Sequence, residues 1–342
     1  MPGPIRTHNA KNSGNHFSPM LSTSSMRKIQ TALSGSWAPS TMQGYRLAIQ
    51  KYHQFCDREN ISKPLRTPAS ELVLCAFAAD NVGKLSAAVA HNQLAAIKAW
   101  HVANNWTWHG SDRLTQILRG VKNLAPITAH HEARQPIPLH AIELLNSRLD
   151  KSNRIDAAIL ACAYTAFWGQ CRLRELLPSS SKIPTPGTLP LCTSLRLSTR
   201  NKSAWVLHLP RTRTNSSGQD VVLVRQRSSL DPISAIQQHL LINRVPHGSP
   251  LFAYYSDSGH VSMLSKKTFL ERCNKVWTEA KYPRYTGHCF RIGGTTELLL
   301  AKVPPDVVKT MGRWSSDAFL KYWRSIEDIV PLHAKNVRTH RK

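Results

Sequence analysis

Acidic residues are scarce in this sequence of 342 residues, and long apolar runs are missing. Its 20 Asp and Glu stand against 45 Lys and Arg, which gives a formal net charge of +25 at pH 7. So large a positive charge favours a polyanionic partner, most simply nucleic acid. No run of 18 apolar residues occurs, which excludes a transmembrane helix, and we expect no membrane partner.

Motifs for metals and nucleotides are also missing. The seven cysteines form no CxxC pair, and the 16 histidines show neither a zinc-finger spacing nor an HExxH motif. The sequence has no Walker loop and no dinucleotide glycine fingerprint. We therefore expect no metal, no nucleotide cofactor and no other cofactor. Most cysteines lie in apolar stretches, which predicts buried, reduced thiols in an intracellular protein.

The start of the chain has the composition of a tail. Residues 1–30 contain no acidic residue and are rich in Ser and Thr, which faintly resembles a mitochondrial transit peptide. Prolines and glycines disfavour the amphipathic helix that such a peptide needs, and the apolar segment of a secretory signal is absent. We therefore expect residues 1–22 to form a disordered basic tail.

Apolar residues spaced three or four apart predict four helices within residues 23–125. Ser40 suits the N-cap of the first helix, and Thr67–Pro68 suits the start of the second. The third is expected over about Ser86–Asn104, and the fourth begins at Asp112. Four helices in about 100 residues predict a small all-α domain.

A linker and a second domain follow. Residues 126–138 hold three prolines and few large apolar side chains, so we expect a linker there. In residues 139–332, helical patterns surround short β-like runs, and residues 333–342 predict a basic tail. Helices are expected at about 139–149, 153–167, 232–243, 266–280, 288–301, 304–311 and 316–325, and strands at 194–197, 205–209 and 221–224. The expected fold class is mainly α with a small β-sheet.

Several polar residues in this second domain suggest phosphate chemistry. Arg172 and Glu175 follow an apolar helix, in the stretch GQCRLRELL. His288 and Arg291 lie three residues apart, so in a helix both point to one side and could approach one phosphate. Between these two motifs, HLPRTRTN has the composition of a basic hairpin, and Tyr322 follows further along the chain.

This order of an arginine, a basic hairpin, His-x-x-Arg and a tyrosine resembles that of the tyrosine recombinases. The stretch TGHCFRIGGTTELLLAKVPPDVVKTMGRWSSDAFLKYWRS looks most like the Crypton and DIRS-type recombinases of eukaryotic mobile elements. The resemblance covers residues 135–330 by motif, and it identifies the helical block with the family's core-binding, SAM-like domain. It implies an α+β catalytic domain, double-stranded DNA as partner, a homotetramer on DNA and a nuclear location.

The resemblance further implies that a mobile element is integrated or excised by a site-specific recombinase, through a 3′-phosphotyrosyl intermediate. Tyr322 would be the nucleophile. Arg172 and Arg291 would hold the nonbridging phosphate oxygens. His288 would move protons or add a hydrogen bond, and Glu175 would brace the site or pair with an arginine.

Two positions depart from the family pattern. The lysine that protonates the leaving oxygen is replaced by Arg213, and arginine is a poor proton donor. Either Arg213 stabilises the leaving oxygen by hydrogen bonding, or Lys202 takes the lysine's place. The family's next site position, a His or Trp, falls on Arg313 by counting back from the tyrosine and on Trp314 by residue type, so both remain candidates.

These departures leave rival hypotheses open. One is a catalytically decayed descendant of a recombinase that only binds DNA, which the replacement at Arg213 and the open choice between Arg313 and Trp314 favour. The other is a type IB topoisomerase, which shares the chemistry. The short chain and the separate helical domain disfavour the topoisomerase.

Overall fold

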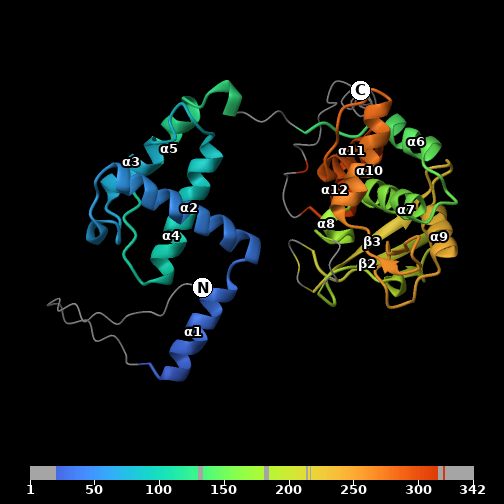
Figure 1. Cartoon of the computed structure of the whole chain (residues 1–342), viewed down its shortest axis with the longest axis horizontal. Helices are drawn as coiled ribbons and strands as arrows, with labels where there is room; N and C mark the ends of the chain where they lie inside the picture. Colours follow the sequence, from blue (N-terminus) through green and yellow to red (C-terminus); the bar gives the residue numbers. More distant parts are fainter. Residues whose placement is uncertain are drawn as a thin grey trace, which may run out of the picture. The chain divides into compact units, whose positions relative to one another are not determined.

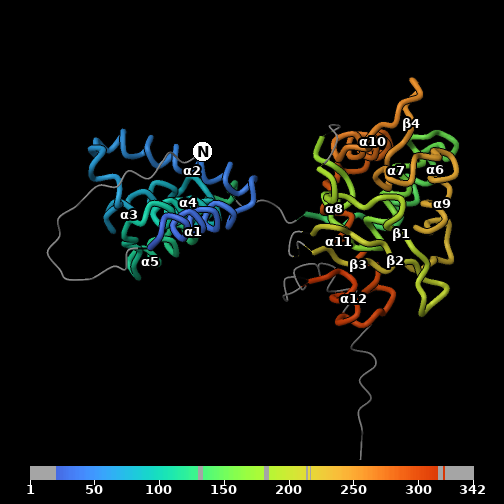
Figure 2. Tube along the Cα trace, turned by 90° about the horizontal axis from the view of Figure 1, so that it is seen from below, coloured from blue at the N-terminus to red at the C-terminus, as the bar shows by residue number. Residues whose placement is uncertain are grey.

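The computed structural model describes residues 21–129, 134–180, 185–212, 215, 217–314 and 319. The chain divides into two compact units, Met1–Glu132 and Ala133–Lys342, which Figures 1 and 2 show from two directions. Both are built mainly from helices, and the second also contains two small antiparallel sheets. The expected fold class, mainly α with a small β-sheet, is therefore confirmed.

The first unit is helical throughout its regular structure. Its core forms where the helices within residues 39–123 pack together, around Tyr52, Phe77, Ile97 and Leu118. Tyr52 is fully buried and donates its hydroxyl hydrogen to the carbonyl of Arg66 over 2.8 Å. The helices are α1 (Thr23–Gly35), α2 (Pro39–Arg58), α3 (Glu71–Ala79), α4 (Ala87–Ala103) and α5 (Asp112–Asn123), with 3-10 turns at Lys63–Leu65 and Ile127–Ala129.

Helix α1 precedes the four expected helices and was not predicted. None of its residues is buried. The apolar side chains of Met26, Ile29 and Leu33 stay exposed, and polar residues fill the rest of the helix. So short an apolar stripe does not distinguish a helix from a polar loop when only the sequence is read.

Two helix starts differ from the predictions. α2 begins at Pro39, with Ala38 and not Ser40 as its N-cap, because proline fits the first helical position. α3 begins after Ser70, whose hydroxyl caps the amide of Val73. The predicted start at Thr67–Pro68 is wrong: residues 66–69 form a turn before the helix, in which the amide of Ala69 donates to the buried ring of His101 over 2.9 Å.

The second unit begins inside the expected linker. The boundary between the units falls between Glu132 and Ala133, and Ile137 is buried in the second unit's core. Its elements in chain order are α6 (Leu139–Arg148), α7 (Arg154–Trp168), α8 (Leu173–Leu176), the 3-10 turn Cys192–Ser194, β1 (Leu195–Leu197), β2 (Ala204–Leu209), β3 (Gln219–Val224), α9 (Pro232–Asn243), β4 (Tyr254–Tyr255), β5 (Val261–Ser262), α10 (Lys266–Glu279), α11 (Gly287–Leu300) and α12 (Pro305–Met311). The predicted helix at 316–325 and the expected tails at 1–22 and 333–342 lie outside the described residues, apart from residues 21, 22 and 319.

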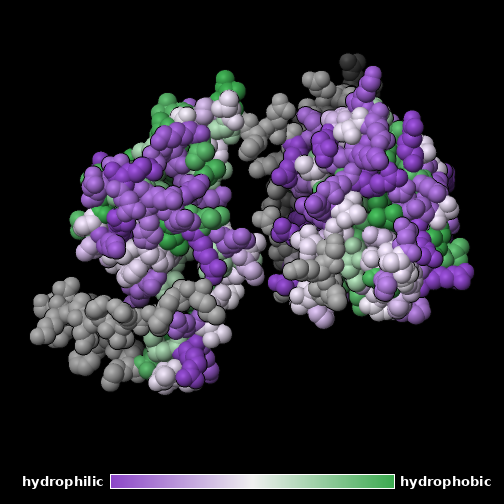
Figure 3. Space-filling model, viewed as in Figure 1, coloured by the Kyte–Doolittle hydropathy of each residue, from purple (hydrophilic) through white to green (hydrophobic). Residues whose placement is uncertain are grey.

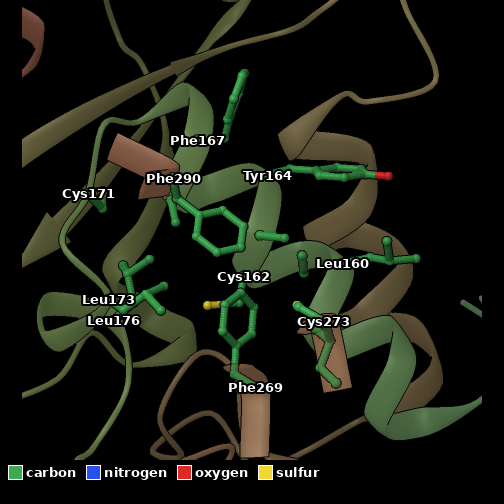
Figure 4. Packing of buried hydrophobic residues seen from close by; sticks show 14 of the residues in the cluster. Leu160, Cys162, Tyr164, Phe167, Cys171, Leu173, Leu176, Phe269, Cys273 and Phe290 are labelled. Atoms are coloured by element: carbon green, nitrogen blue, oxygen red, sulfur yellow. The ribbon is translucent and has the colours of Figure 1, made fainter. Parts of the chain in front are cut away.

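Helix α7 is the centre of this unit. It packs against α9 and α11, and every residue from Asp156 to Phe167 is buried. The apolar sequence ILACAYTAFW explains this burial, because a helix that is apolar on all sides belongs inside a core. Figure 4 shows the ring of Phe290 from α11 beside that of Phe269 from α10, with 5.3 Å between the ring centroids, and Tyr164 and Phe167 on the neighbouring α7.

Two glycines allow α11 to approach α7 closely. A Cβ atom on Gly294 would lie 1.9 Å from the carbonyl oxygen of Phe167 in α7. One on Gly293 would lie 2.8 Å from the Phe167 ring, and 2.3 Å from the carbonyl oxygen of Ile137 in the segment before α6. Only a residue without a side chain fits at such separations. This contact brings the first turns of α11 next to the end of α7, and so next to Arg172.

A three-stranded antiparallel sheet, ordered β1-β2-β3, covers the same end of α7. Leu207 pairs with Val221 across β2 and β3, and both are buried. The side chains of Val221 and Leu223 lie so close to Gly169 that a Cβ there would come within 3.0 Å of them. The connection between β2 and β3 was predicted as a hairpin, and its residues Arg213, Thr214 and Ser216 lie outside the described residues.

The cysteines and the surface agree with a compact interior. All seven cysteines are free thiols, and all except the half-buried Cys192 are buried, which confirms the expected buried thiols.

Among the described helices, none is both long enough and apolar enough to cross a membrane. Figure 3 shows hydrophilic residues over most of the visible face of each unit.

Candidate active site

The turn that follows α7 positions Arg172. Gly169 ends α7, and Gln170 takes a left-handed backbone conformation with φ of 47°. Arg172 is then the N-cap residue of the short helix α8. Its backbone N–H donates to Glu175 Oε2 over 3.0 Å, and its guanidinium Nη1 donates to Glu175 Oε1 over 2.7 Å. The backbone and the side chain of Arg172 are thus held by one carboxylate.

Glu175 is shared by two arginines. Its side chain is only 3% exposed, and Arg313 Nη2 donates to Glu175 Oε2 over 3.0 Å. A buried carboxylate requires such partners, because an unpaired charge is costly to remove from water. With two guanidinium groups on one carboxylate, the cluster keeps an excess of positive charge.

The turn after α12 delivers Arg313 to this carboxylate. The amide of Arg313 donates to Thr310 O over 2.9 Å, and the amide of Trp314 donates to Lys309 O over 3.2 Å. These two bonds form a Schellman motif, in which glycine usually takes the left-handed position. Here Arg313 takes it, with φ of 57°.

Gly312 lets the ring of Trp314 fold back over this turn. A Cβ atom on Gly312 would lie between 1.6 and 2.4 Å from three atoms of the Trp314 ring. The carbonyl of Gly312 also accepts a hydrogen bond from Arg291 Nη2. The tripeptide Gly312-Arg313-Trp314 therefore sends one side chain to Glu175 and the other to Arg291.

Arg291 lies on the second turn of α11 and is fully buried. Its guanidinium carbon lies 4.3 Å from the centroid of the Trp314 ring. Burial, together with the neighbouring cations Arg172 and Arg313, lowers the pKa of Arg291 to about 10. Its Nε and Nη1 atoms have no hydrogen-bond partner among the described residues.

Unpartnered donors gather at this cluster. Besides the two on Arg291, Gln170 Nε2 and Arg313 Nε are buried and have no partner among the described residues. The side-chain oxygen of Gln170 is bound to α11, because Thr295 Oγ1 donates to Gln170 Oε1 over 3.0 Å. Buried donors without acceptors are rare in folded proteins. Three arginines around one carboxylate, with N–H groups left over, form a site suited to an oxyanion such as phosphate.

The structure brings four predicted site residues together: Arg172, Arg291, Arg313 and Trp314. His288 lies on the first turn of α11 and is half-buried. Arg213 and Tyr322 lie outside the described residues. Lys202, the alternative to Arg213, is exposed in the turn before β2.

Some features of the site were not predicted from the sequence. The contact between Arg313 and Glu175 joins residues that are far apart in the chain, and no pattern in the sequence indicates it. Gln170 was missed because a glutamine carries no mark of a left-handed conformation. Gly312 could have been noticed, because a glycine directly after a helix is typical of a helix C-terminus.

The architecture is similar to that of solved DNA recombinases and integrases. The XerH site-specific recombinase in a post-cleavage complex with palindromic difH substrate matches with a TM-score of 0.58 and 15% identity, over 92% of this chain and 84% of that chain. The Tn1549 transposon integrase (residues 82–397, Y379F) with transposon right end DNA matches with a TM-score of 0.54 and 13% identity, over 92% of this chain and 99% of that chain. A lambda integrase (75–356) dimer bound to a COC' core site matches with a TM-score of 0.50 and 14% identity, over 89% and 95%.

These likenesses show that the chain has the tyrosine recombinase fold. No protein-family model and no curated protein matches the sequence.

Proposed function

We propose that this chain is a tyrosine-type DNA recombinase that cleaves and rejoins double-stranded DNA. The observation that supports this most is the buried Arg291, which lies in a cluster with Arg172, Arg313 and a single carboxylate and keeps Nε and Nη1 unpartnered among the described residues. A fully buried cation with donors left over is explained if a phosphate oxygen binds there. The net charge of +25 favours binding to the other phosphates of the DNA backbone.

In the proposed reaction, the hydroxyl oxygen of Tyr322 attacks a backbone phosphorus. A 3′-phosphotyrosyl bond forms, and the bond between phosphorus and the 5′-oxygen breaks. The tyrosine hydroxyl gives up one proton and the leaving 5′-oxygen gains one, so the number of protons is unchanged. Because one phosphodiester replaces another, the step needs no nucleotide cofactor. Arg172 and Arg291 bind the nonbridging oxygens and oppose the charge that grows in the transition state. His288 lies on the same helix as Arg291 and moves protons.

The biological setting is part of the proposal. The resemblance to Crypton and DIRS-type recombinases supports integration or excision of a mobile element, a homotetramer on DNA and a nuclear location. One solved protein of the same fold is a transposon integrase in complex with circular intermediate DNA, similar to this chain with a TM-score of 0.51.

The test is the formation of a covalent protein–DNA adduct. A duplex recovered by selection from a random pool is synthesised with a nick beside the cleavage site, so that the short 5′-hydroxyl strand diffuses away and rejoining is prevented. We expect the wild-type chain to form an adduct that survives denaturing electrophoresis. Tyr322→Phe should form none and should bind the same duplex with nearly unchanged affinity, because it loses one hydroxyl and no cation.

Tyr282 and Tyr285 provide a check on the nucleophile. Tyr285 is buried against Trp277, and burial raises the pKa of its hydroxyl, which disfavours the reactive phenolate. Tyr285→Phe should therefore retain the adduct. An adduct that persists in Tyr322→Phe would show that another tyrosine attacks.

A second candidate function is DNA binding without cleavage. The replacement of the family's lysine by Arg213 favours it, because arginine rarely gives up a proton. On this alternative, the wild-type chain binds the selected duplex but forms no adduct with it. Relaxation of supercoiled DNA by a monomer, without a specific site, would instead support a type IB topoisomerase.

A further inference from the structure

The guanidinium of Arg313 is turned into the protein. The side chain is 6% exposed, and its Nη2 atom donates to Glu175 Oε2 over 3.0 Å. Its Nη1 and Nη2 atoms also donate to the carbonyls of Gly169 and Gln170, over 3.2 and 3.4 Å. These carbonyls belong to the turn that leads directly to Arg172. Both terminal nitrogens of Arg313 are therefore engaged with the loop that carries another arginine.

Arg172 and Arg291 differ from Arg313 in the terminal guanidinium nitrogens that they leave available, since Arg313 keeps only its Nε atom unpartnered among the described residues. Arg172 uses Nη1 for Glu175, and its side chain is 25% exposed. Arg291 uses Nη2 for Gly312 and keeps Nε and Nη1 unpartnered among the described residues. A phosphate that binds at this cluster thus meets donors from Arg172 and Arg291, whereas the terminal nitrogens of Arg313 already have acceptors.

Glu175 connects Arg313 to Arg172. Its Oε2 atom accepts from both Arg313 Nη2 and the backbone N–H of Arg172, while Oε1 accepts from Arg172 Nη1. Fixing one carboxylate oxygen fixes the plane of the whole group, because the two oxygens share a single rigid frame. The direction of the Arg172 guanidinium therefore depends on the bond between Arg313 and Glu175.

We propose that Arg313 is a positioning residue, which holds Glu175 and the turn at Gly169 and thereby aims Arg172, and that it does not bind the phosphate itself. This inference rests on the proposed function. Arg313 and Trp314, the two candidates for the family's His or Trp position, then have different tasks: Arg313 holds Glu175, and the Trp314 ring contacts Arg291.

The backbone of Arg313 is consistent with such a task. A left-handed conformation is unfavourable for an arginine and favourable for a glycine. An unfavourable conformation persists when the surrounding contacts more than offset it. Here the guanidinium supplies these contacts, with one carboxylate and two carbonyls of a neighbouring loop.

The first measurement is the salt dependence of DNA binding, which does not require cleavage. The probe is the duplex selected from a random pool, with the full-length chain. The slope of log K against log salt changes by about 0.9 for each phosphate contact that is lost. We expect Arg172→Gln and Arg291→Gln each to lose about 0.9 in this slope, and Arg313→Gln to keep the wild-type slope. A loss of about 0.9 in Arg313→Gln would overturn the proposal.

Arg272→Gln is the matched control for this measurement. Arg272 also pairs with a buried carboxylate, that of Asp156, over 2.7 Å, but it joins α10 to α7 outside the cluster. Arg272→Gln removes one buried ion pair and one positive charge, as Arg313→Gln does. It should keep both the wild-type slope and the wild-type cleavage rate once folded.

The second measurement is a double-mutant cycle on adduct formation with Glu175→Gln. If Arg313 acts through Glu175, each single variant slows cleavage about 10-fold or more, and the double variant is no slower than Glu175→Gln alone. If Arg313 touches the phosphate, the two losses multiply instead. Arg313→Lys keeps a positive charge beside Glu175 and should recover most of the rate.

The outcomes separate this inference from the proposed function. A wild-type chain that forms no adduct contradicts the proposed function, while the salt slopes still report on Arg313. A wild-type chain that cleaves, with multiplied losses in the cycle, contradicts the positioning role alone. If Arg313→Gln does not fold, Arg313→Lys and the double variant Glu175→Gln/Arg313→Gln, which removes both charges of the buried Arg313–Glu175 pair, carry both measurements.

Discussion

The guanidinium of Arg291 lies over the ring of Trp314, with 4.3 Å between its central carbon and the ring centroid. An aromatic face attracts a cation without taking any of its N–H groups. Arg291 is fully buried, which by itself disfavours a charge. The ring therefore stabilises a buried cation and leaves its N–H groups available for an oxyanion.

A substitution of Trp314 that removes the aromatic ring should slow cleavage more than one that replaces it with a smaller aromatic ring. A cation–π contact contributes about 0.5–2 kcal/mol, so Trp314→Leu should slow adduct formation by about 2- to 30-fold. Trp314→Phe keeps an aromatic face and should stay closer to the wild-type rate. Single-turnover cleavage rates measure the difference, and equal losses in the two variants would mean that Trp314 acts by filling space.

Arg172→Ala and Arg291→Ala should each lose cleavage far more than binding. Each removes one cation among many in the chain, yet each is expected to touch the reacting phosphate. We expect adduct formation to fall by about 10²–10³ and the dissociation constant to rise by about 10-fold at most, as for one lost phosphate contact. Arg272→Ala removes a paired arginine elsewhere in the unit and serves as control. Parallel losses of binding and cleavage would make the two arginines ordinary backbone contacts.

Arg291→Lys should make cleavage depend on pH in a new way. A lysine has an unperturbed pKa of about 10.4. At position 291 it would meet the burial and the neighbouring cations that lower the pKa of Arg291 to about 10. Both influences favour the neutral amine, so the lysine loses its charge as pH rises through a range in which Arg291 keeps it. The ratio of variant to wild-type cleavage rate should therefore fall as pH rises, and a constant ratio would contradict the explanation.

The role of Arg213 can be tested with a modified leaving group. A 5′-bridging sulfur departs without protonation, so wild-type protein should cleave such a substrate much faster than normal DNA if Arg213 is a poor acid. Arg213→Lys should then accelerate cleavage of normal DNA and scarcely change that of the sulfur substrate. If Arg213→Lys slows normal cleavage, arginine is the working residue and acts by charge and hydrogen bonding.

Gly294→Ala should destabilise the second unit. The added carbon would lie 1.9 Å from the carbonyl oxygen of Phe167, which is backbone and cannot move aside easily. We expect a loss of about 3 kcal/mol in the free energy of unfolding, measured by urea denaturation of the full chain. Gly120→Ala in α5 is the control, because a Cβ there meets nothing within 4 Å. It should gain about 0.5–1 kcal/mol.

The sequence was most informative where a regular pattern repeats. The all-apolar stretch of α7 and the spacing of the later helices predicted elements that the structure contains, within a residue or two at most ends. A pattern of this kind reports on burial, and burial decides where helices form. The start of α3 was missed because Thr67–Pro68 has the residue types of a helix start, whereas the structure has a turn there whose Ala69 amide contacts His101 on another helix.

The site was predictable as a set of residues, but its internal connections were not. A resemblance to a family can nominate Arg172, Arg291 and Arg313 one by one. It cannot show that Arg313 and Arg172 share Glu175, because that sharing depends on how the turn after α12 meets the turn after α7. Arg213 and Tyr322 lie outside the described residues, and their roles stay predictions.

The contact between α7 and α11 also determines when, during synthesis and folding of the chain, the residues of the site can come together. Arg172 and Arg291 are separated by about 120 residues of chain, and such a long loop closes late in folding. On a ribosome, the first unit and α7 emerge well before α11 and the turn that holds Trp314. A growing or truncated chain that lacks α11 therefore lacks Arg291 and Trp314, and the cluster around Glu175 is incomplete until both have been made.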